Sequence, residues 1–173
     1  MNEPRLWLSP ESDLDRALAA EPDALVVSFG SPTRTTPRPA RVPTDRFVAF
    51  SFNDIAEKRA GLVPPAPEDA ARMRRVIAET DAAAIVFQCW FGVSRSAAAA
   101  LLGLSLRWQA APEAAVAILR RAAPWSTPNP LLAALVDAEL GLGGRLERAV
   151  RAAGRGVDAV GVEAVQLRRE ARV

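Results

Sequence analysis

The segment 82–87, AAAIVF, restricts the fold more than any other feature, because it is a continuous apolar run of strand length. A strand with one wet face alternates apolar and polar residues, whereas a continuous run is typical of a strand that is covered on both faces. Such strands lie in the middle of parallel sheets with helices on each side. We therefore expect segment 82–87 to form a central strand of an α/β domain.

Further strands are predicted at 5–10 (RLWLSP), 23–30 and 46–52. Apolar residues at helical spacing, with acids or prolines near the start and glycines or prolines at the end, predict helices at 11–22, 68–81, 96–109, 112–124, 129–141 and 144–156. Strands alternate with helices at first, and only helices follow. This order favours an α/β fold with a central, mostly parallel sheet of about four to five strands and a helical C-terminal half. The stretch 162–173 has no clear assignment.

Composition limits the chemistry that the chain can perform. At 173 residues we expect one domain, over residues 1–173. The chain has no histidine and one cysteine, which excludes Cys-His and Ser-His nucleophile pairs, an imidazole metal site and a multi-cysteine zinc site. We therefore expect no metal and no cofactor. The net charge of +2 is too small to favour nucleic acid as a partner.

The apolar segments also bear on where the protein acts. None reaches the roughly 18 residues of a membrane-spanning helix, so we expect no membrane partner. The N-terminal sequence MNEPRLWLSPESD has an acid and a proline early and no long apolar core, unlike a signal peptide. A single cysteine forms no internal disulfide. These features favour a cytoplasmic protein.

The sole cysteine, Cys89, stands two positions after the apolar run, in the sequence FQCWFGVSRSAAAALL. A lone cysteine beside a buried strand is most often a small core residue. Here, however, a glycine-containing loop and a helix start come next, and ligands of α/β sheets lie outside the carboxyl ends of the strands. A loop that enters a helix N-terminus directs its amides toward an anion. The context favours an anion site over a core thiol.

Three neighbours of the cysteine fit the same kind of site. Gly92 lets the loop adopt a positive φ, and the planar fork of Arg95 suits two phosphate oxygens. Ser96 falls at the start of the helix, where its hydroxyl could donate to the sulfur. Amides, helix dipole and guanidinium all favour the thiolate, which is the nucleophilic form. One set of donors would thus activate Cys89 and hold the dianion that it attacks.

The spacing Cys-x5-Arg-Ser, here CWFGVSRS, resembles the signature of the protein tyrosine phosphatase superfamily. The loop lies late in the domain, which resembles the dual-specificity-like branch. The chain is also similar to a group of bacterial predicted protein tyrosine phosphatases, through FNDI at residues 52–55 and TPNP at residues 127–130. With these segments the resemblance extends from the first strand to about Arg155.

The resemblance implies a two-step mechanism with named residues. Cys89 attacks phosphorus and forms a phosphocysteine, and an aspartic acid protonates the leaving oxygen and then activates water. Asp54 is the candidate acid, because it lies on a loop after a strand, 35 residues before Cys89. Turn formation or helix capping is the alternative role for Asp54. Glu57 is the fallback acid, whereas Asp81 lies at the wrong edge of the sheet.

The resemblance also implies which groups bind phosphate. The loop amides and the Arg95 guanidinium contact the equatorial oxygens, where charge must be stabilised. The loop residues are Trp90, Phe91, Gly92, Val93, Ser94 and Arg95. We expect phosphate or sulfate to occupy this loop, with Ser96 supporting the sulfur. Asn129 either helps to hold the loop or caps the next helix.

Gln88 stands where the superfamily almost always has histidine, a residue that holds the loop and favours the thiolate. A glutamine amide is a neutral donor that could keep part of that network, so we expect slower turnover rather than inactivity. The alternative function is a catalytically weak or inactive pseudophosphatase, which binds phosphate and recognises phosphorylated partners.

The loop between the cysteine and the arginine has no basic residue, which argues against a phosphoinositide substrate. A phosphotyrosine-containing protein or a small aryl phosphomonoester is the expected substrate. Trp90 and Phe91 are either core residues or a rim for an aromatic group. Arg34, Arg38 and Arg41 are either a basic rim or part of a solvated loop.

Overall fold

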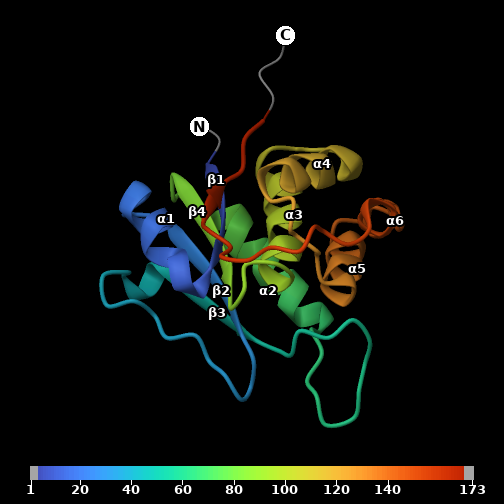
Figure 1. Ribbon diagram of the computed structural model, residues 1–173, viewed down its shortest axis with the longest axis horizontal. Coiled ribbons are helices and arrows are strands. Elements are labelled where there is room, and N and C mark those ends of the chain that lie inside the picture. The colour runs from blue at the N-terminus through green and yellow to red at the C-terminus, as the bar shows by residue number, and fades with distance from the viewer. Residues whose placement is uncertain (1–3, 170–173) are drawn as a thin grey trace.

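The computed structural model describes residues 4–169, and Figure 1 shows a central sheet with α1 on one side and the other helices on the opposite side. The strands are β1 (Arg5–Pro10), β2 (Leu25–Gly30), β3 (Phe47–Ser51), β4 (Ala84–Cys89) and β5 (Val165–Gln166). The helices are α1 (Leu14–Ala20), α2 (Pro67–Glu79), α3 (Arg95–Arg107), α4 (Pro112–Ala122), α5 (Pro130–Glu139) and α6 (Arg145–Ala153). The predicted α/β order and the helical C-terminal half are confirmed.

Across the described residues the sheet has five strands, in the order β3-β2-β4-β1-β5. The central strand β4 pairs in parallel with both β1 and β2, and β2 pairs in parallel with β3. Only the short β5 runs antiparallel, against β1. The predicted mostly parallel sheet is confirmed. Every residue of β4 is buried, which explains why the sequence here lacks an alternating pattern.

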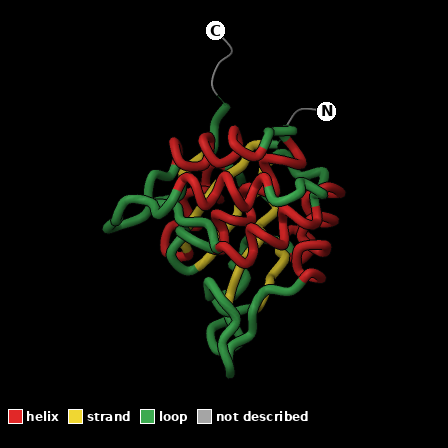
Figure 2. Tube along the Cα trace, turned by 90° about the vertical axis from the view of Figure 1, so that its right-hand side faces the viewer, coloured by secondary structure: helices red, strands yellow, loops and turns green. Residues whose placement is uncertain are grey.

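The two faces of the sheet carry separate apolar clusters, because successive side chains of a strand point to opposite faces. On one face, Leu18 of α1 packs in a cluster with Val86 of β4. On the other face, Phe87 packs in the larger cluster with Leu101 of α3. Figure 2 shows the helical layer of this second face in front of the strands. No helix between residues 4 and 169 is both long and apolar enough to cross a bilayer.

The structure moves several of the predicted boundaries. Strand β4 covers residues 84–89 instead of 82–87, because its pairing with β1 and β2 continues through the polar Gln88 to Cys89. The predicted helix at 11–22 begins with a 3-10 turn and becomes α-helical only at Leu14. The unassigned stretch supplies β5, while residues 170–173 lie outside the described part of the chain.

After α6 the chain crosses the molecule to reach β5 beside β1 (Figure 1). We call residues 154–164 the C-terminal strap. The helix that leads into the strap is fixed by Asp137 of α5, whose carboxylate accepts a hydrogen bond from the backbone N–H of Leu146 at 2.6 Å. At the far end, the Asp13 carboxylate accepts one from the N–H of Ala164 at 2.7 Å. The strap is therefore anchored at both ends.

Candidate active site

The loop that follows β4 has the predicted arrangement of strand, turn and helix start, since Cys89 ends β4 and Arg95 begins α3. Gly92 has a φ of 67°. A Cβ atom at Gly92 would lie 2.6 Å from the backbone nitrogen of Pro10, so the turn requires glycine for both its conformation and its space. The loop is also held from the side, because the N–H of Thr127 donates to the carbonyl of Val93 at 2.9 Å.

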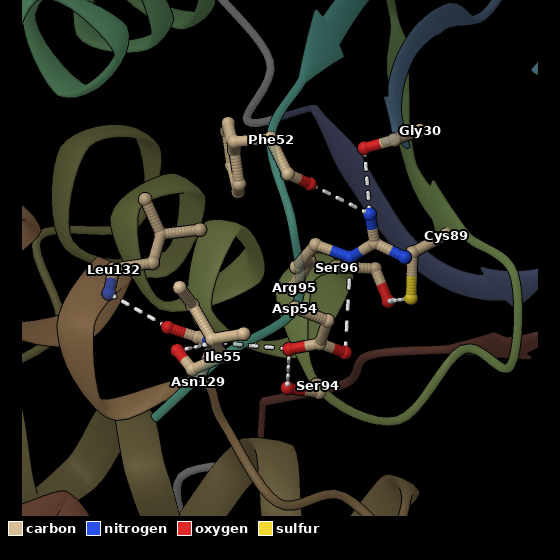
Figure 3. Close-up of polar contacts among 10 residues, drawn as sticks. All are labelled: Gly30, Phe52, Asp54, Ile55, Cys89, Ser94, Arg95, Ser96, Asn129 and Leu132. Atoms are coloured by element: carbon tan, nitrogen blue, oxygen red, sulfur yellow. Dashed lines mark hydrogen bonds and ion pairs between the residues drawn. The ribbon is translucent and has the colours of Figure 1, made fainter. Parts of the chain in front are cut away.

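Cys89 lies at the floor of a pocket and is only 2% exposed. Its sulfur is 3.0 Å from the hydroxyl oxygen of Ser96, which belongs to the first turn of α3 (Figure 3). A hydroxyl at this distance can donate a hydrogen bond to a thiolate. The sequence spacing of seven residues thus places the two side chains in contact.

Arg95 is a buried cation, with 6% of its surface exposed. Its Nη1 donates to the backbone carbonyls of Gly30, at 2.6 Å, and Phe52, at 3.0 Å. These two bonds fix the plane of the guanidinium between Asp54 and Cys89 (Figure 3). The buried Nε has no hydrogen-bond partner, although it lies 3.7 Å from a carboxylate oxygen of Asp54. Arg95 therefore retains donor capacity for an oxyanion at this site.

Asp54 joins the same site from the loop after β3. Its Oδ1 accepts hydrogen bonds from the Ser94 hydroxyl at 2.7 Å and from the Asn129 amide at 2.8 Å (Figure 3). Asn129 also caps α5, because its side-chain oxygen accepts from the N–H of Leu132 at 2.9 Å. The predicted capping role is thus present, and the backbone N–H of Asn129 also donates to the carbonyl of Ser94 in the phosphate loop at 3.2 Å. Since Oδ1 is held by two donors, Oδ2 is the oxygen of Asp54 that faces the Arg95 guanidinium.

Gln88 is fully buried, but its side chain belongs to the other face of the sheet. Alternation along β4 places it on the same face as Val86, which contacts the α1 layer. Its Oε1 accepts a hydrogen bond from the Ser28 hydroxyl at 2.7 Å, and its Nε2 has no partner. Gln88 can therefore influence Cys89 only through the backbone of the strand.

Trp90 and Phe91 are not core residues, since they are 46% and 62% exposed. Their rings stack with centroids 4.6 Å apart. The guanidinium of Arg34 lies 4.0 Å from the Trp90 ring centroid and also pairs with Glu11 at 2.6 Å. The rim interpretation of the two aromatic residues thus agrees with their exposure.

The two remaining arginines of the proline-rich loop lie elsewhere. Arg38 donates to the carbonyl of Val42, and Arg41 pairs with Asp15 at 2.5 Å. Neither lines the pocket around Cys89. For these two residues, the solvated-loop interpretation fits better than a basic rim.

The pocket above Cys89 has a volume of about 400 Å³. Asp54, Cys89 and Arg95 lie in its lining together with Trp125. The C-terminal strap contributes six further lining residues, which are Arg155, Gly156, Val157, Asp158, Ala159 and Val162. The sequence interpretation missed Trp125 and the strap, because no local pattern relates them to a loop that lies more than 30 residues earlier.

Comparison with known proteins establishes the fold. No family model matches the sequence, and no curated protein is detectably similar to it. Solved structures of dual-specificity phosphatases do match, so the chain has their fold. Human DUSP28 matches with a TM-score of 0.56 and 18% identity, over 85% of this chain and 94% of that chain.

Two further structures agree. A mouse putative dual specificity phosphatase, determined as a complex with zinc tungstate, has a TM-score of 0.55 and 16% identity, over 87% of this chain and 93% of its own. DUSP15 has a TM-score of 0.54 and 15% identity, over 87% of this chain and 97% of its own. At such low identities the likeness establishes the fold and leaves the activity to be argued from the site.

Proposed function

We propose that the protein is a cysteine-dependent phosphomonoester hydrolase of the protein tyrosine or dual-specificity type. The observation that carries this proposal is the convergence of Cys89, Arg95 and Asp54 on one pocket. A thiol, a guanidinium and a carboxylate around one anion-binding loop supply the nucleophile, the charge stabilisation and the acid that cleavage of a P–O ester bond requires. The fold supports the same conclusion.

In the first step the thiolate of Cys89 attacks phosphorus, so that an S–P bond forms while the P–O bond to the leaving group breaks. Asp54, in its protonated form, gives its proton to the departing oxygen. The loop amides of residues 90–95 and the Arg95 guanidinium hold the three equatorial oxygens, whose charge is the one that the transition state must stabilise. The step yields a phosphocysteine and a free alcohol or phenol.

In the second step the Asp54 carboxylate takes a proton from a water molecule whose oxygen attacks phosphorus. The S–P bond breaks, the thiolate of Cys89 returns and inorganic phosphate leaves. Ser96 donates to the returning thiolate, which improves sulfur as a leaving group. Because Ser94 and Asn129 hold Oδ1 of Asp54, we assign both proton transfers to Oδ2.

The proposed substrate is a phosphotyrosine-containing protein or a small aryl phosphomonoester, acted on in the cytoplasm. The absence of basic residues between Cys89 and Arg95 supports this choice over a substrate with several phosphates. We further propose that residues 1–173 act as one domain without a metal or cofactor, since the mechanism needs neither.

A phosphate-binding pseudophosphatase is the second candidate function. The observation that favours it is Gln88, whose side chain faces away from the pocket and contacts Ser28 instead. In relatives with histidine, the imidazole at this position holds the loop and favours the thiolate. A neutral glutamine amide replaces it here. Such a protein would use Arg95 and the loop amides to recognise phosphorylated partners without turning them over.

Phosphate release from p-nitrophenyl phosphate separates the two functions. The hydrolase predicts measurable release by the wild type and a loss of at least about a thousandfold in Cys89→Ser. Calorimetric binding of inorganic phosphate provides the second readout. No release by the wild type, together with retained phosphate binding, would establish the binding function instead.

A further inference from the structure

The C-terminal strap contributes six lining residues to the pocket whose floor is the phosphate-binding loop. Its residues follow α6 and lie more than 60 positions after Cys89, yet they share a single cavity with Cys89 and Arg95. Phe91 and Val93 of the loop line the same cavity. A substrate whose phosphoryl group reaches the sulfur therefore has strap residues within the pocket that it occupies.

The lining of this pocket above the floor is mostly apolar. The apolar contributors are Phe91, Val93, Trp125, Val157, Ala159 and Val162. The two charged strap residues that line the pocket, Arg155 and Asp158, pair with each other at 2.5 Å, so neither offers an uncompensated charge to a second anionic group. An apolar ring fits these walls better than a short polar carrier or a second phosphate.

Near its start the strap is held against the segment that contains Trp125. The N–H of Val157 donates to the carbonyl of Pro124 at 3.0 Å, and the N–H of Gly156 donates to the Thr127 hydroxyl at 3.0 Å. A Cβ atom on Gly156 would lie 2.4 Å from the carbonyl carbon and oxygen of Trp125. Only glycine therefore allows the strap to approach this closely.

We propose that the C-terminal strap is a substrate-recognition wall, in which Val157 contacts the ring of an aryl phosphomonoester and favours it over an alkyl one. This proposal deepens the proposed function, because it names the residues that select the substrate of that same site. Binding of non-hydrolysable phosphonates tests it independently of turnover, with phenylphosphonate as the aryl probe and methylphosphonate as the alkyl probe.

The strap offers a matched pair of variants. Val157, at 62% exposed, lines the pocket, whereas Val160 is fully exposed at 104% and does not. For Val157→Ser we expect about fivefold weaker binding of phenylphosphonate, because part of the apolar contact with the ring is lost. Methylphosphonate should bind as it does to the wild type. For Val160→Ser neither Kd should change.

Gly156→Ala provides a second test, because it keeps the valine side chain at position 157 but moves the strap away from Trp125. We expect it to weaken phenylphosphonate more than methylphosphonate, with the circular dichroism spectrum unchanged. Equal Kd values of Val157→Ser and wild type for phenylphosphonate would overturn the proposal, as would equal losses for both phosphonates.

The outcomes also separate this proposal from the proposed hydrolase function. The wild type could bind phenylphosphonate in preference to methylphosphonate and yet release no phosphate from any monoester. That result would support the substrate-recognition role of the strap and contradict the hydrolase function. Equal kcat/KM for aryl and alkyl monoesters, together with equal affinities for the two phosphonates, would contradict the substrate-recognition role of the strap. The hydrolase function would still be supported.

Discussion

The floor and the wall of the pocket are built in different ways. The floor, residues 89–96, is buried at its two key positions and is held by backbone groups from separate parts of the chain. The backbone carbonyls of Gly30 and Phe52 accept hydrogen bonds from the guanidinium of Arg95. The wall, the C-terminal strap, is largely exposed and depends on a few hydrogen bonds and one close glycine contact.

This difference separates the two requirements of the proposed reaction. Charge stabilisation at phosphorus depends on donors that are already in position, so the floor must be rigid. Recognition of the rest of the substrate tolerates variation in sequence and conformation. In many enzymes exposed connecting segments provide this recognition. Changes in the floor should therefore reduce turnover for all substrates, whereas changes in the wall should alter the preference among them.

The largest expected effect comes from exchanging the cation of the floor. In Arg95→Lys the planar fork is lost, and an ammonium group cannot reproduce its bonds to Gly30 and Phe52 while holding two phosphate oxygens. We expect kcat for p-nitrophenyl phosphate to fall about 100- to 1000-fold. Arg155→Lys, in the wall, is the matched control and should change kcat less than about twofold, since its charge is exposed and paired. Similar losses of kcat in both variants would contradict the expectation that the floor controls turnover while the wall controls substrate preference.

A smaller effect is expected from the acid. Asp54→Asn should lower kcat about 100-fold for phenyl phosphate and less for p-nitrophenyl phosphate, because a nitrophenolate leaves more readily without a proton. Glu57→Gln is the control, because Glu57 is exposed and pairs only weakly with Arg59 at 3.5 Å. If the Glu57 variant carries the loss instead, the acid has been assigned to the wrong residue.

Gln88→His tests whether a side chain on the opposite face of β4 changes the reactivity of the Cys89 thiol. The side chain faces the α1 layer, so its influence on the sulfur must pass through the strand backbone. We expect iodoacetate to alkylate Cys89 at lower pH, with roughly two- to threefold faster reaction at pH 7. Gln88→Leu, which removes the bond from Ser28 without adding an imidazole, should not show this acceleration. An unchanged alkylation profile in Gln88→His would exclude an effect of residue 88 on the reactivity of Cys89.

The smallest effect lies outside both floor and wall, at the amino end of β1. A hydrogen bond from Arg5 lowers the pKa of Glu21, and a second from Trp7 acts in the same direction against the effect of burial. A lowered folded-state pKa stabilises the protein fully above the ordinary value of about 4.3 and loses this contribution as the pH falls through the folded-state value. The Tm of Glu21→Gln should therefore lie below that of wild type at pH 7.

The difference in Tm between wild type and Glu21→Gln should shrink as the pH drops below about 4. Phosphatase activity at pH 7 should be unchanged, because β1 reaches the loop only at its opposite end, beside Cys89. A loss of activity in this variant would mean that changes at the amino end of β1 affect the floor.

The floor could be predicted from sequence because its chemistry is local. The thiol, the turn glycine, the guanidinium and the hydroxyl all fall between Cys89 and Ser96, and strand-to-loop-to-helix geometry then places them together. Asp54 required the additional inference that carboxyl ends of parallel strands share one edge. The direction of Gln88 could also have been predicted, since strand alternation separates it from Cys89.

The wall could not be predicted for a physical reason. The strap has no regular pattern, and its position depends on α6 being held by Asp137 and on β5 pairing with β1. These are contacts between segments far apart in the sequence, and neither leaves a local signature. The two-residue β5 is also too short to be recognised from alternation.

The position of the strap so late in the chain has a consequence for the newly made protein. Chains emerge from the ribosome with the N-terminal part first, so β1, β2, β3, β4 and the phosphate-binding loop are available before residues 154–166 appear. Until the strap is made, the phosphate-binding loop lacks the strap residues that line its pocket. With the role proposed for the strap, substrate choice is therefore one of the last properties that the growing chain acquires.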